Sequence, residues 1–229
     1  MAALLGLRDA ASVQGDRSVE TRLRVVQRVE LARIEIASTA AELDCESERA
    51  EQAADYLSRR QTKSVQLLTI GSVAAAALTG IAGVFLSTRD APATGQEVLA
   101  VSGGAVTAGL GLASLFVHAR TRFDHPRNLL ADIWTGPATS LTYPPFVWTY
   151  FTRAEFSNAQ REAIRARIVA RWRRFEEVGD ARTAELLFGT GGSYDADTLR
   201  TRAAMLDEVR AEVELTQQDL AELAAAVLR

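Results

Sequence analysis

The sequence predicts an all-α protein in which long, coiled-coil-like helical arms flank a Gly/Ala-rich hairpin of two apolar helices. Residues 17–70 contain neither Gly nor Pro and carry apolar residues at a 4-3 spacing, which is typical of helices that pack along one face. Residues 64–88 and 98–117 contain no charged residue, and the polar stretch between them holds Pro92 and Gly95, which favour a turn. No segment shows the alternating pattern of a strand.

Composition places the chain among ordinary globular proteins and limits its partners. Of the 229 residues, 48% are hydrophobic and 24% are charged, and the net charge is −3. No global attraction to nucleic acid or anionic lipid is therefore expected. The single cysteine, Cys45, excludes an intramolecular disulfide. Residues 1–8 lack the basic start and the long apolar run of a signal peptide.

The N-terminal part is predicted to be one long helix. We expect residues 1–16 to be a flexible terminus and residues 17–63 to form a helical arm. Arg33 and Ser47 interrupt its apolar stripe. The stripe consists of Val26, Val29, Ile36, Ala40, Leu43, Ala50, Ala54 and Leu57. Because no helix stop occurs near Lys63, the arm is expected to continue into the first apolar segment without a break.

The predicted hairpin, residues 64–119, is long enough to cross a bilayer, because about 20 apolar residues span the hydrocarbon core. Small residues recur every four positions in both segments, which favours close helix packing. The predicted packing residues are Ser72, Ala76, Gly80, Gly83, Gly103, Gly104, Gly109 and Gly111. We interpret the segment as a transmembrane hairpin of glycine-zipper type, with a hairpin buried inside a helical bundle as the alternative.

Basic residues flank this hairpin at both of its arm ends. Arg59, Arg60 and Lys63 precede it, and Arg120 and Arg122 follow it. The positive-inside rule then predicts a membrane protein whose arms are cytoplasmic. If a signal peptide has been removed upstream, the alternative location is the periplasm.

Residues 120–156 are predicted to be an aromatic, Pro-rich connector. We expect a short helix near residues 127–134 and irregular chain after it, because Pro144 and Pro145 disfavour a helix. The aromatic side chains suit either a membrane-interface belt or the core where connector and arms meet. The residues assigned to the membrane interface are Trp134, Trp148, Tyr150, Arg165 and Trp172.

Residues 157–229 are predicted to form helices that pack on the N-terminal arm. Ser157 and Gln160 resemble a capping box that opens a helix to Val178. Its expected buried face comprises Ile164, Ile168, Trp172 and Phe175. Its many arginines suit an anionic membrane surface, nucleic acid, or a solvated face paired with acidic arms.

Two further helices are predicted towards the C-terminus. Asp180 is expected to cap a short helix, and residues 189–192 are expected to be a loop. The last helix starts at Asp195 or Asp197 and carries a heptad-like seam. The seam consists of Leu199, Leu206, Val209, Val213, Leu220, Leu223 and Val227.

No pattern of catalytic or ligand-binding residues emerges, so no catalytic residue, cofactor or metal is predicted. His118 and His125 lack the helical spacing or the further ligands of a metal site. The Gly-rich residues 189–192 lack the Lys-Ser/Thr and the preceding strand of a P-loop. Acidic neighbours surround Cys45 and disfavour its thiolate, so we expect it to be a packing residue.

The functional hypothesis is a non-enzymatic, membrane-embedded scaffold that self-associates through its hairpin and arms. It implies a homo-oligomer and contact with a lipid bilayer, and nucleic acid is not an expected partner. The alternative is a soluble or periplasmic helical-bundle binding module with the hairpin buried internally. A weaker alternative is a pore-forming or membrane-permeabilising protein.

Overall fold

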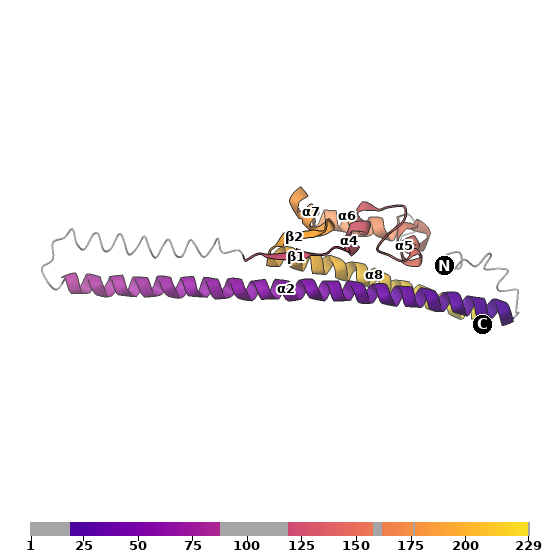
Figure 1. Ribbon diagram of the computed structural model, residues 1–229, viewed down its shortest axis with the longest axis horizontal. Helices are drawn as coiled ribbons and strands as arrows, with labels where there is room; N and C mark the ends of the chain where they lie inside the picture. Colours follow the sequence, from indigo (N-terminus) through magenta and orange to yellow (C-terminus); the bar gives the residue numbers. More distant parts are fainter. Residues whose placement is uncertain (1–18, 88–118, 158–161, 176, 229) are drawn as a thin grey trace. The chain divides into compact units, whose positions relative to one another are not determined.

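The computed structural model describes residues 19–87, 119–157, 162–175 and 177–228. The chain is mostly helical and divides into two compact units, a first unit of residues 1–53 and 122–229 and a second unit of residues 54–121. The helix α2 (Val19–Ser87) contributes residues to both units (Figure 1). The predicted continuation of the arm into the first apolar segment is therefore confirmed. The second apolar segment lies outside the described residues.

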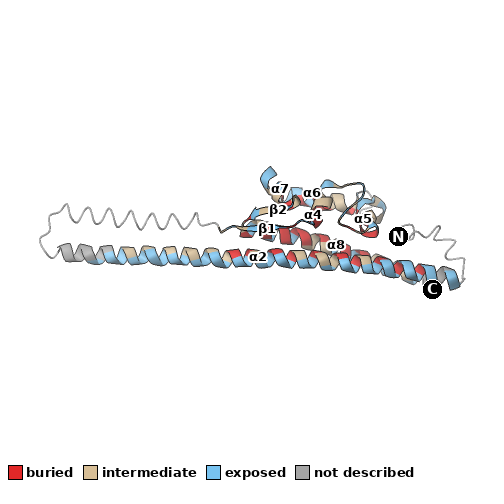
Figure 2. Cartoon of the chain, viewed as in Figure 1, coloured by how far each residue is buried: buried red, intermediate tan, exposed pale blue. Residues whose placement is uncertain are grey.

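The first unit is built on a pair of long helices. The C-terminal helix α8 (Ala196–Leu228) lies beside α2 and runs antiparallel to it (Figure 1). Ser47 of α2 donates a hydrogen bond to the carbonyl oxygen of Ala203, and Asp44 forms an ion pair with Arg210. Figure 2 shows that the buried residues of both helices lie along their contact. Burial of this continuous seam holds the pair together.

The buried positions follow a 3-4 spacing in both helices. In α2 they are Val25, Val29, Ala32, Ile36, Thr39, Leu43, Ser47 and Ala50. In α8 they are Leu199, Arg202, Leu206, Val209, Val213, Thr216 and Leu220. The sequence pattern places Val26 in the seam of α2, but Val25 is buried instead and Val26 is 40% exposed. Ser47 does not interrupt the seam, because its hydroxyl has a backbone partner on α8.

Short helices and a small sheet cover one side of α8. These are α4 (Leu129–Thr135), α5 (Pro145–Thr152), the 3-10 turn η1 (Ala154–Phe156), α6 (Ile164–Arg174) and α7 (Ala181–Phe188). The helix α4 contacts α6, α7 and α8, and α5 packs on α6. Their apolar faces and the aromatic side chains between them form the core of the first unit. We call this group the cap.

The cap corrects the prediction that the chain contains no strand. The strands β1 (Thr121–Asp124) and β2 (Gly191–Tyr194) pair in a two-stranded sheet. Gly191 adopts a φ of +115°, and a Cβ atom there would lie 2.4 Å from the carbonyl oxygen of Phe123. The predicted Gly-rich loop is therefore a strand whose close approach to its neighbour requires glycine.

Two helix predictions in the cap are also wrong. Pro145 is the first residue of α5, a position where the missing N–H costs nothing and the fixed φ suits a helix. The helix α6 begins at Ile164 without a side-chain cap, and Ser157 instead ends η1. Phe175 follows α6 and is 64% exposed, so it does not belong to the buried face. In contrast, Asp180 and Asp195 accept the predicted capping hydrogen bonds, from the amides of Thr183 and Thr198.

The second unit corrects the membrane predictions. Within the described residues, no helix is long and apolar enough to cross a bilayer. In residues 64–87 the large apolar residues alternate with Ala, Gly, Ser and Thr, which dilutes the hydropathy below that of a spanning helix. The membrane-embedded scaffold, the transmembrane glycine zipper and the membrane location with cytoplasmic arms are therefore not supported.

Gly136 ends α4 and provides a test of the cap. Its φ is +65°, in the left-handed region, and a Cβ atom there would lie 2.5 Å from the guanidinium carbon of Arg165. We expect Gly136→Ala to lower the free energy of unfolding by about 1 kcal/mol, because alanine is strained at this helix end. Urea denaturation checks this value, and Gly71→Ala, where no atom lies within 4 Å of the added Cβ, should not destabilise the protein.

Candidate interaction surface

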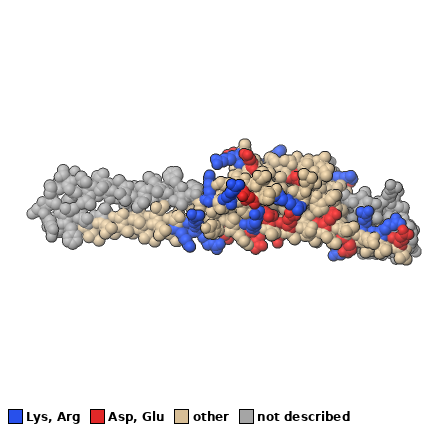
Figure 3. All heavy atoms as spheres, in the orientation of Figure 1, with Lys and Arg blue, Asp and Glu red and all other residues tan. Residues whose placement is uncertain are grey.

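The helix α2 exposes large aliphatic side chains along its uncharged stretch in the second unit. They are Leu67 at 71%, Ile70 at 65%, Val73 at 64%, Leu78 at 69% and Ile81 at 57% exposure. Helical geometry of about 3.6 residues per turn places them on one side of α2. Figure 3 shows this stretch without a charged residue. Contiguous exposed apolar surface of this kind is typical of interaction sites.

The opposite side of the same stretch is less exposed. Ser64, Val65, Leu68, Ser72 and Ala75 are half-buried. We call the more exposed side, which carries Ile70, Val73 and Ile81, the outer face of α2. In the first unit, considered by itself, α2 also exposes Val26, Ile34 and Ala37. Of these, Val26 and Ile34 are 40% and 62% exposed, so apolar side chains lie outside the contact with α8.

The small residues predicted as a packing interface are only partly described. Ser72 is half-buried and Ala76 is exposed. Gly80 and Gly83 lie in α2, and their surroundings are outside the description. Gly103, Gly104, Gly109 and Gly111 lie outside the described residues. In the part of the chain that the structure covers, the outer face is thus formed by large aliphatic residues that the small-residue pattern did not single out.

The residues predicted for a membrane interface lie in the cap, where their partners are protein groups. Trp148 is buried and donates to the carbonyl oxygen of Pro137 at 3.1 Å. Tyr150 donates to Asp219 at 2.5 Å, and Trp172 is buried and donates to Glu208 at 2.9 Å. Trp134 stacks on Phe188 at a centroid distance of 4.5 Å. These aromatic side chains therefore contact protein groups of the first unit.

The arginines of α6 bind acidic and carbonyl groups within the first unit. Arg167 pairs with Glu212 at 3.1 Å and Arg171 with Glu208 at 3.3 Å, both on α8. Arg165 donates to the carbonyl oxygen of Ile133 at 2.7 Å, at the C-terminal end of α4. These pairs agree with the hypothesis of a bundle face paired with an acidic helix.

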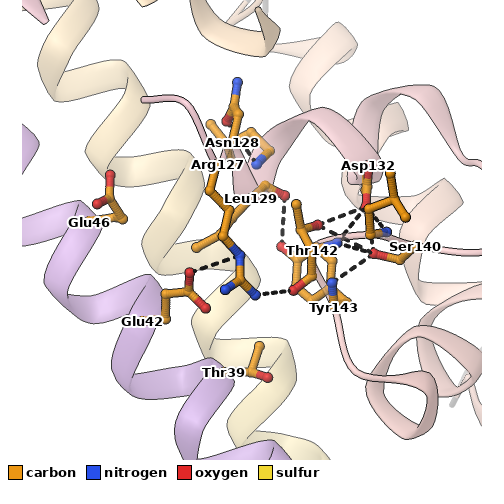
Figure 4. Close-up of polar contacts among 12 residues, drawn as sticks. Thr39, Glu42, Glu46, Arg127, Asn128, Leu129, Asp132, Ser140, Thr142 and Tyr143 are labelled. Atoms are coloured by element: carbon orange, nitrogen blue, oxygen red, sulfur yellow. Dashed lines mark hydrogen bonds and ion pairs between the residues drawn. The ribbon is translucent and has the colours of Figure 1, made fainter. Parts of the chain in front are cut away.

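A polar network joins α2 to the cap (Figure 4). Arg127 pairs with Glu42 of α2 at 3.2 Å and donates to the carbonyl oxygen of Thr142 at 2.6 Å. One oxygen of Asp132 accepts from the hydroxyls of Ser140 and Thr142, at 2.5 and 2.7 Å. Although burial raises the pKa of Asp132, these hydrogen bonds lower it below its ordinary value. The network fixes the loop between α4 and α5.

A second polar cluster is buried between the sheet and α8. Arg202 is fully buried and donates to the side-chain oxygen of Asn128 at 3.2 Å and to the carbonyl oxygen of Leu187 at 2.9 Å. Among the described residues, no carboxylate lies within ion-pair distance of Arg202. Burial lowers the pKa of Arg202 to about 10. His125 is 1% exposed and its Nε2 lies 2.8 Å from the Tyr194 hydroxyl.

This cluster positions backbone rather than a reacting group. The hydroxyl of Tyr194 donates to the carbonyl oxygen of Leu186, so His125 donates to Tyr194 as the neutral Nε2–H tautomer. Burial, with the charge of Arg202, lowers the pKa of His125 to about 4. The side chains therefore tie α7 and β2 to β1 and α8. Within the described residues, no group of three or more His, Cys, Asp or Glu is placed to hold a metal ion.

A shallow groove lies between the N-terminal part of α2 and the C-terminal part of α8. Its volume is about 330 Å³. Val29, Arg33, Gln217, Leu220, Ala221 and Ala224 line it. A mostly aliphatic lining with a single cation offers few groups that could orient a small polar ligand.

Comparison with protein-family models, with curated proteins and with solved structures finds no match to this chain.

Proposed function

We propose that this chain is a non-enzymatic helical binding module whose outer face of α2 binds another apolar helix. The exposure of Ile70, Val73 and Ile81 on an uncharged helix carries the proposal. An aliphatic helix face is the usual partner of a second such face, because both lose apolar area to water when they pack.

The remainder of the first unit suits a supporting role in this proposal. We infer that α2 and α8 form an antiparallel coiled coil, since their buried residues follow a 3-4 spacing. The cap contacts α8 through α4 and α6, and Arg127 joins it to α2. Within the first unit, α8 and the cap therefore hold α2 in place.

Binding of a designed amphipathic helix tests this function. The probe is a fluorescein-labelled 21-residue peptide, with Leu at the a and d positions of each heptad and Glu or Lys elsewhere. We expect the full chain to raise its anisotropy with a micromolar dissociation constant. Ile70→Glu should weaken binding by about tenfold or more, because a charge replaces a buried aliphatic contact.

Thr69→Glu is the matched control, since it adds the same charge at the neighbouring exposed position, at the edge of the outer face. It should leave the affinity nearly unchanged. Circular dichroism should show equal helicity in all three proteins. If neither the probe nor a second copy of the chain binds, or if Ile70→Glu binds the probe as tightly as the parent, the proposed function is wrong.

A further inference from the structure

We propose that β1 is a strand that mild acid releases: when His125 takes up a second proton, residues 122–125 leave β2 and α2, while α2 and α8 stay paired. Residues 122–125 and all the groups that they contact here belong to the first unit. The release does not depend on the proposed function. Three features support it: the enclosure of His125, the charges that face it, and the contacts that hold β1.

His125 directly follows β1 and is enclosed by protein groups, with 1% of its surface exposed. Its Nε2–H donates to the hydroxyl of Tyr194 at 2.8 Å, and its amide donates to the carbonyl oxygen of Thr190 at 3.0 Å. The Tyr194 phenol stays neutral, since burial raises its pKa to about 12. The Nδ1 atom of His125 is buried and has no hydrogen-bond partner among the described residues. Because Nε2 carries the proton of the neutral ring, a second proton has to bind at Nδ1.

Cations face His125 from two other elements. Arg202 of α8 and Arg49 of α2 both disfavour a positive charge on the imidazole. Burial is the largest cause and, together with these charges, lowers the pKa of His125 from 6.5 to about 4, although the carbonyl oxygens of His125 and Gly189 favour the charged ring. A second proton thus enters a buried site beside two cations, which costs free energy unless the ring moves into water.

The carboxylates near this site have other partners. Glu46 of α2 pairs with Arg49 at 2.6 Å and offsets part of its charge. Asp124, the last residue of β1, pairs with Arg122 at 3.0 Å. Within the described part of the chain, no carboxylate is hydrogen-bonded to His125. The charge of a second proton on this ring is therefore not compensated by an acidic partner.

The strand β1 is held through β2, Arg49 and Tyr194. The sheet has only two short strands, and such a pair is marginally stable by itself. Arg49 donates to the carbonyl oxygen of Asp124 at 3.2 Å and lies 4.3 Å over the Phe123 ring. The Phe123 ring meets Tyr194 edge-on at 5.8 Å. Since Arg49 and Tyr194 also face His125, displacement of its ring disturbs the contacts that hold the strand.

The pair of α2 and α8 has contacts of its own. Its seam buries apolar residues of both helices, such as Ile36 and Val213. Arg202 also keeps its acceptors when β1 leaves, because these are the side chain of Asn128 and the carbonyl oxygen of Leu187. Departure of residues 122–125 is therefore a local opening of the first unit and leaves its helical core folded.

Acid favours the open form, because its His125 lies in water and has the ordinary pKa of 6.5. The open form gains its proton as the pH falls through 6.5, whereas the closed form gains it only near pH 4. The ratio of open to closed molecules should therefore rise about thirtyfold between pH 7.5 and pH 5. The range stops at pH 5 because carboxylates ordinarily titrate at about pH 4.

Native-state hydrogen exchange of the full chain tests the release. Amide exchange is followed by mass spectrometry at pH 7.5 and pH 5, corrected for the intrinsic rates, in steps of urea below the unfolding transition. We expect residues 122–125 to be less protected than residues 199–213 of α8 and to exchange independently of urea, since a local opening exposes little surface. Their protection factor should fall about thirtyfold from pH 7.5 to pH 5. Residues 199–213 should exchange through a urea-dependent unfolding.

His125→Gln is the test variant, because glutamine stays neutral. Residues 122–125 of this variant should keep the same protection factor at both pH values. His118→Gln is the matched control, since the chain has two histidines, and it should retain the thirtyfold change. A change of this size that persists in His125→Gln would overturn the role of His125.

The parent protein decides whether the opening is local, even if His125→Gln does not fold. Residues 122–125 that show the same urea dependence as residues 199–213 at pH 5 would mean that acid unfolds the first unit as a whole. That result would overturn the release of β1, and it would leave the proposed binding of an apolar helix by α2 unaffected.

Discussion

Asn128→Ala is expected to lower the free energy of unfolding by about 4 kcal/mol. Asn128 is the N-cap of α4, and its side-chain oxygen accepts from the amide of Leu130. The same oxygen accepts two hydrogen bonds from the buried guanidinium of Arg202. Loss of the cap costs about 1 kcal/mol. The buried Arg202 also loses one of its two acceptors and keeps only the carbonyl oxygen of Leu187, which costs about 3 kcal/mol more.

The side-chain amide of Asn128 adds to this effect. It donates to the carbonyl oxygens of Leu187 and Gly189, both at 2.8 Å, so truncation leaves two acceptors without this donor. Urea denaturation at neutral pH measures the loss, provided that the dependence on urea concentration stays constant. Asp180→Ala is the control, because it removes an N-cap at an exposed position with no buried cation behind it. It should be clearly less destabilising, and equal losses would contradict the role of Arg202.

The buried seam of α8 shows which buried residues the sequence pattern can predict and which it cannot. Leu199, Leu206, Val209, Val213 and Leu220 are predicted from their spacing and are buried. Arg202 occupies a position of the same seam, but a charged residue there gives no signal of burial. Its burial depends on carbonyl and amide oxygens from α4 and α7, which no local pattern reveals. Thr216 is also buried in this seam, and it was not predicted because a polar residue gives no signal of burial either.

In the cap, the helix N-cap residues could be predicted from the sequence, but the pairing of strands β1 and β2 could not. Asp180 and Asp195 act locally, through amides three residues ahead, so sequence alone identifies them. The strands β1 and β2 have four residues each and are far apart in the sequence. Strands this short give no alternating pattern, and their contact depends on the close approach at Gly191. The sequence did not identify the outer face as a helix-binding surface, because the same apolar residues also suit a membrane hairpin.

Acidification is expected to destabilise the protein through His125. Its pKa is lowered from 6.5 to about 4 in the folded state, by burial and by the nearby charges of Arg202 and Arg49. Between these values the unfolded chain binds a proton that the folded chain excludes. The stabilisation is complete above pH 6.5 and decreases as the pH falls to about 4. The loss over this range is about 3 kcal/mol.

His125→Gln isolates this contribution, because glutamine stays neutral and its amide can still donate to the Tyr194 hydroxyl. The variant should be less stable than the parent at neutral pH, since its shape differs from that of the imidazole. The difference between the two proteins should shrink as the pH falls from 6.5 to 4, because carboxylates such as Asp132 titrate equally in both. Urea denaturation in steps across this range measures the difference. Parallel stability curves would show that His125 gains its proton as easily in the folded chain as in the unfolded one.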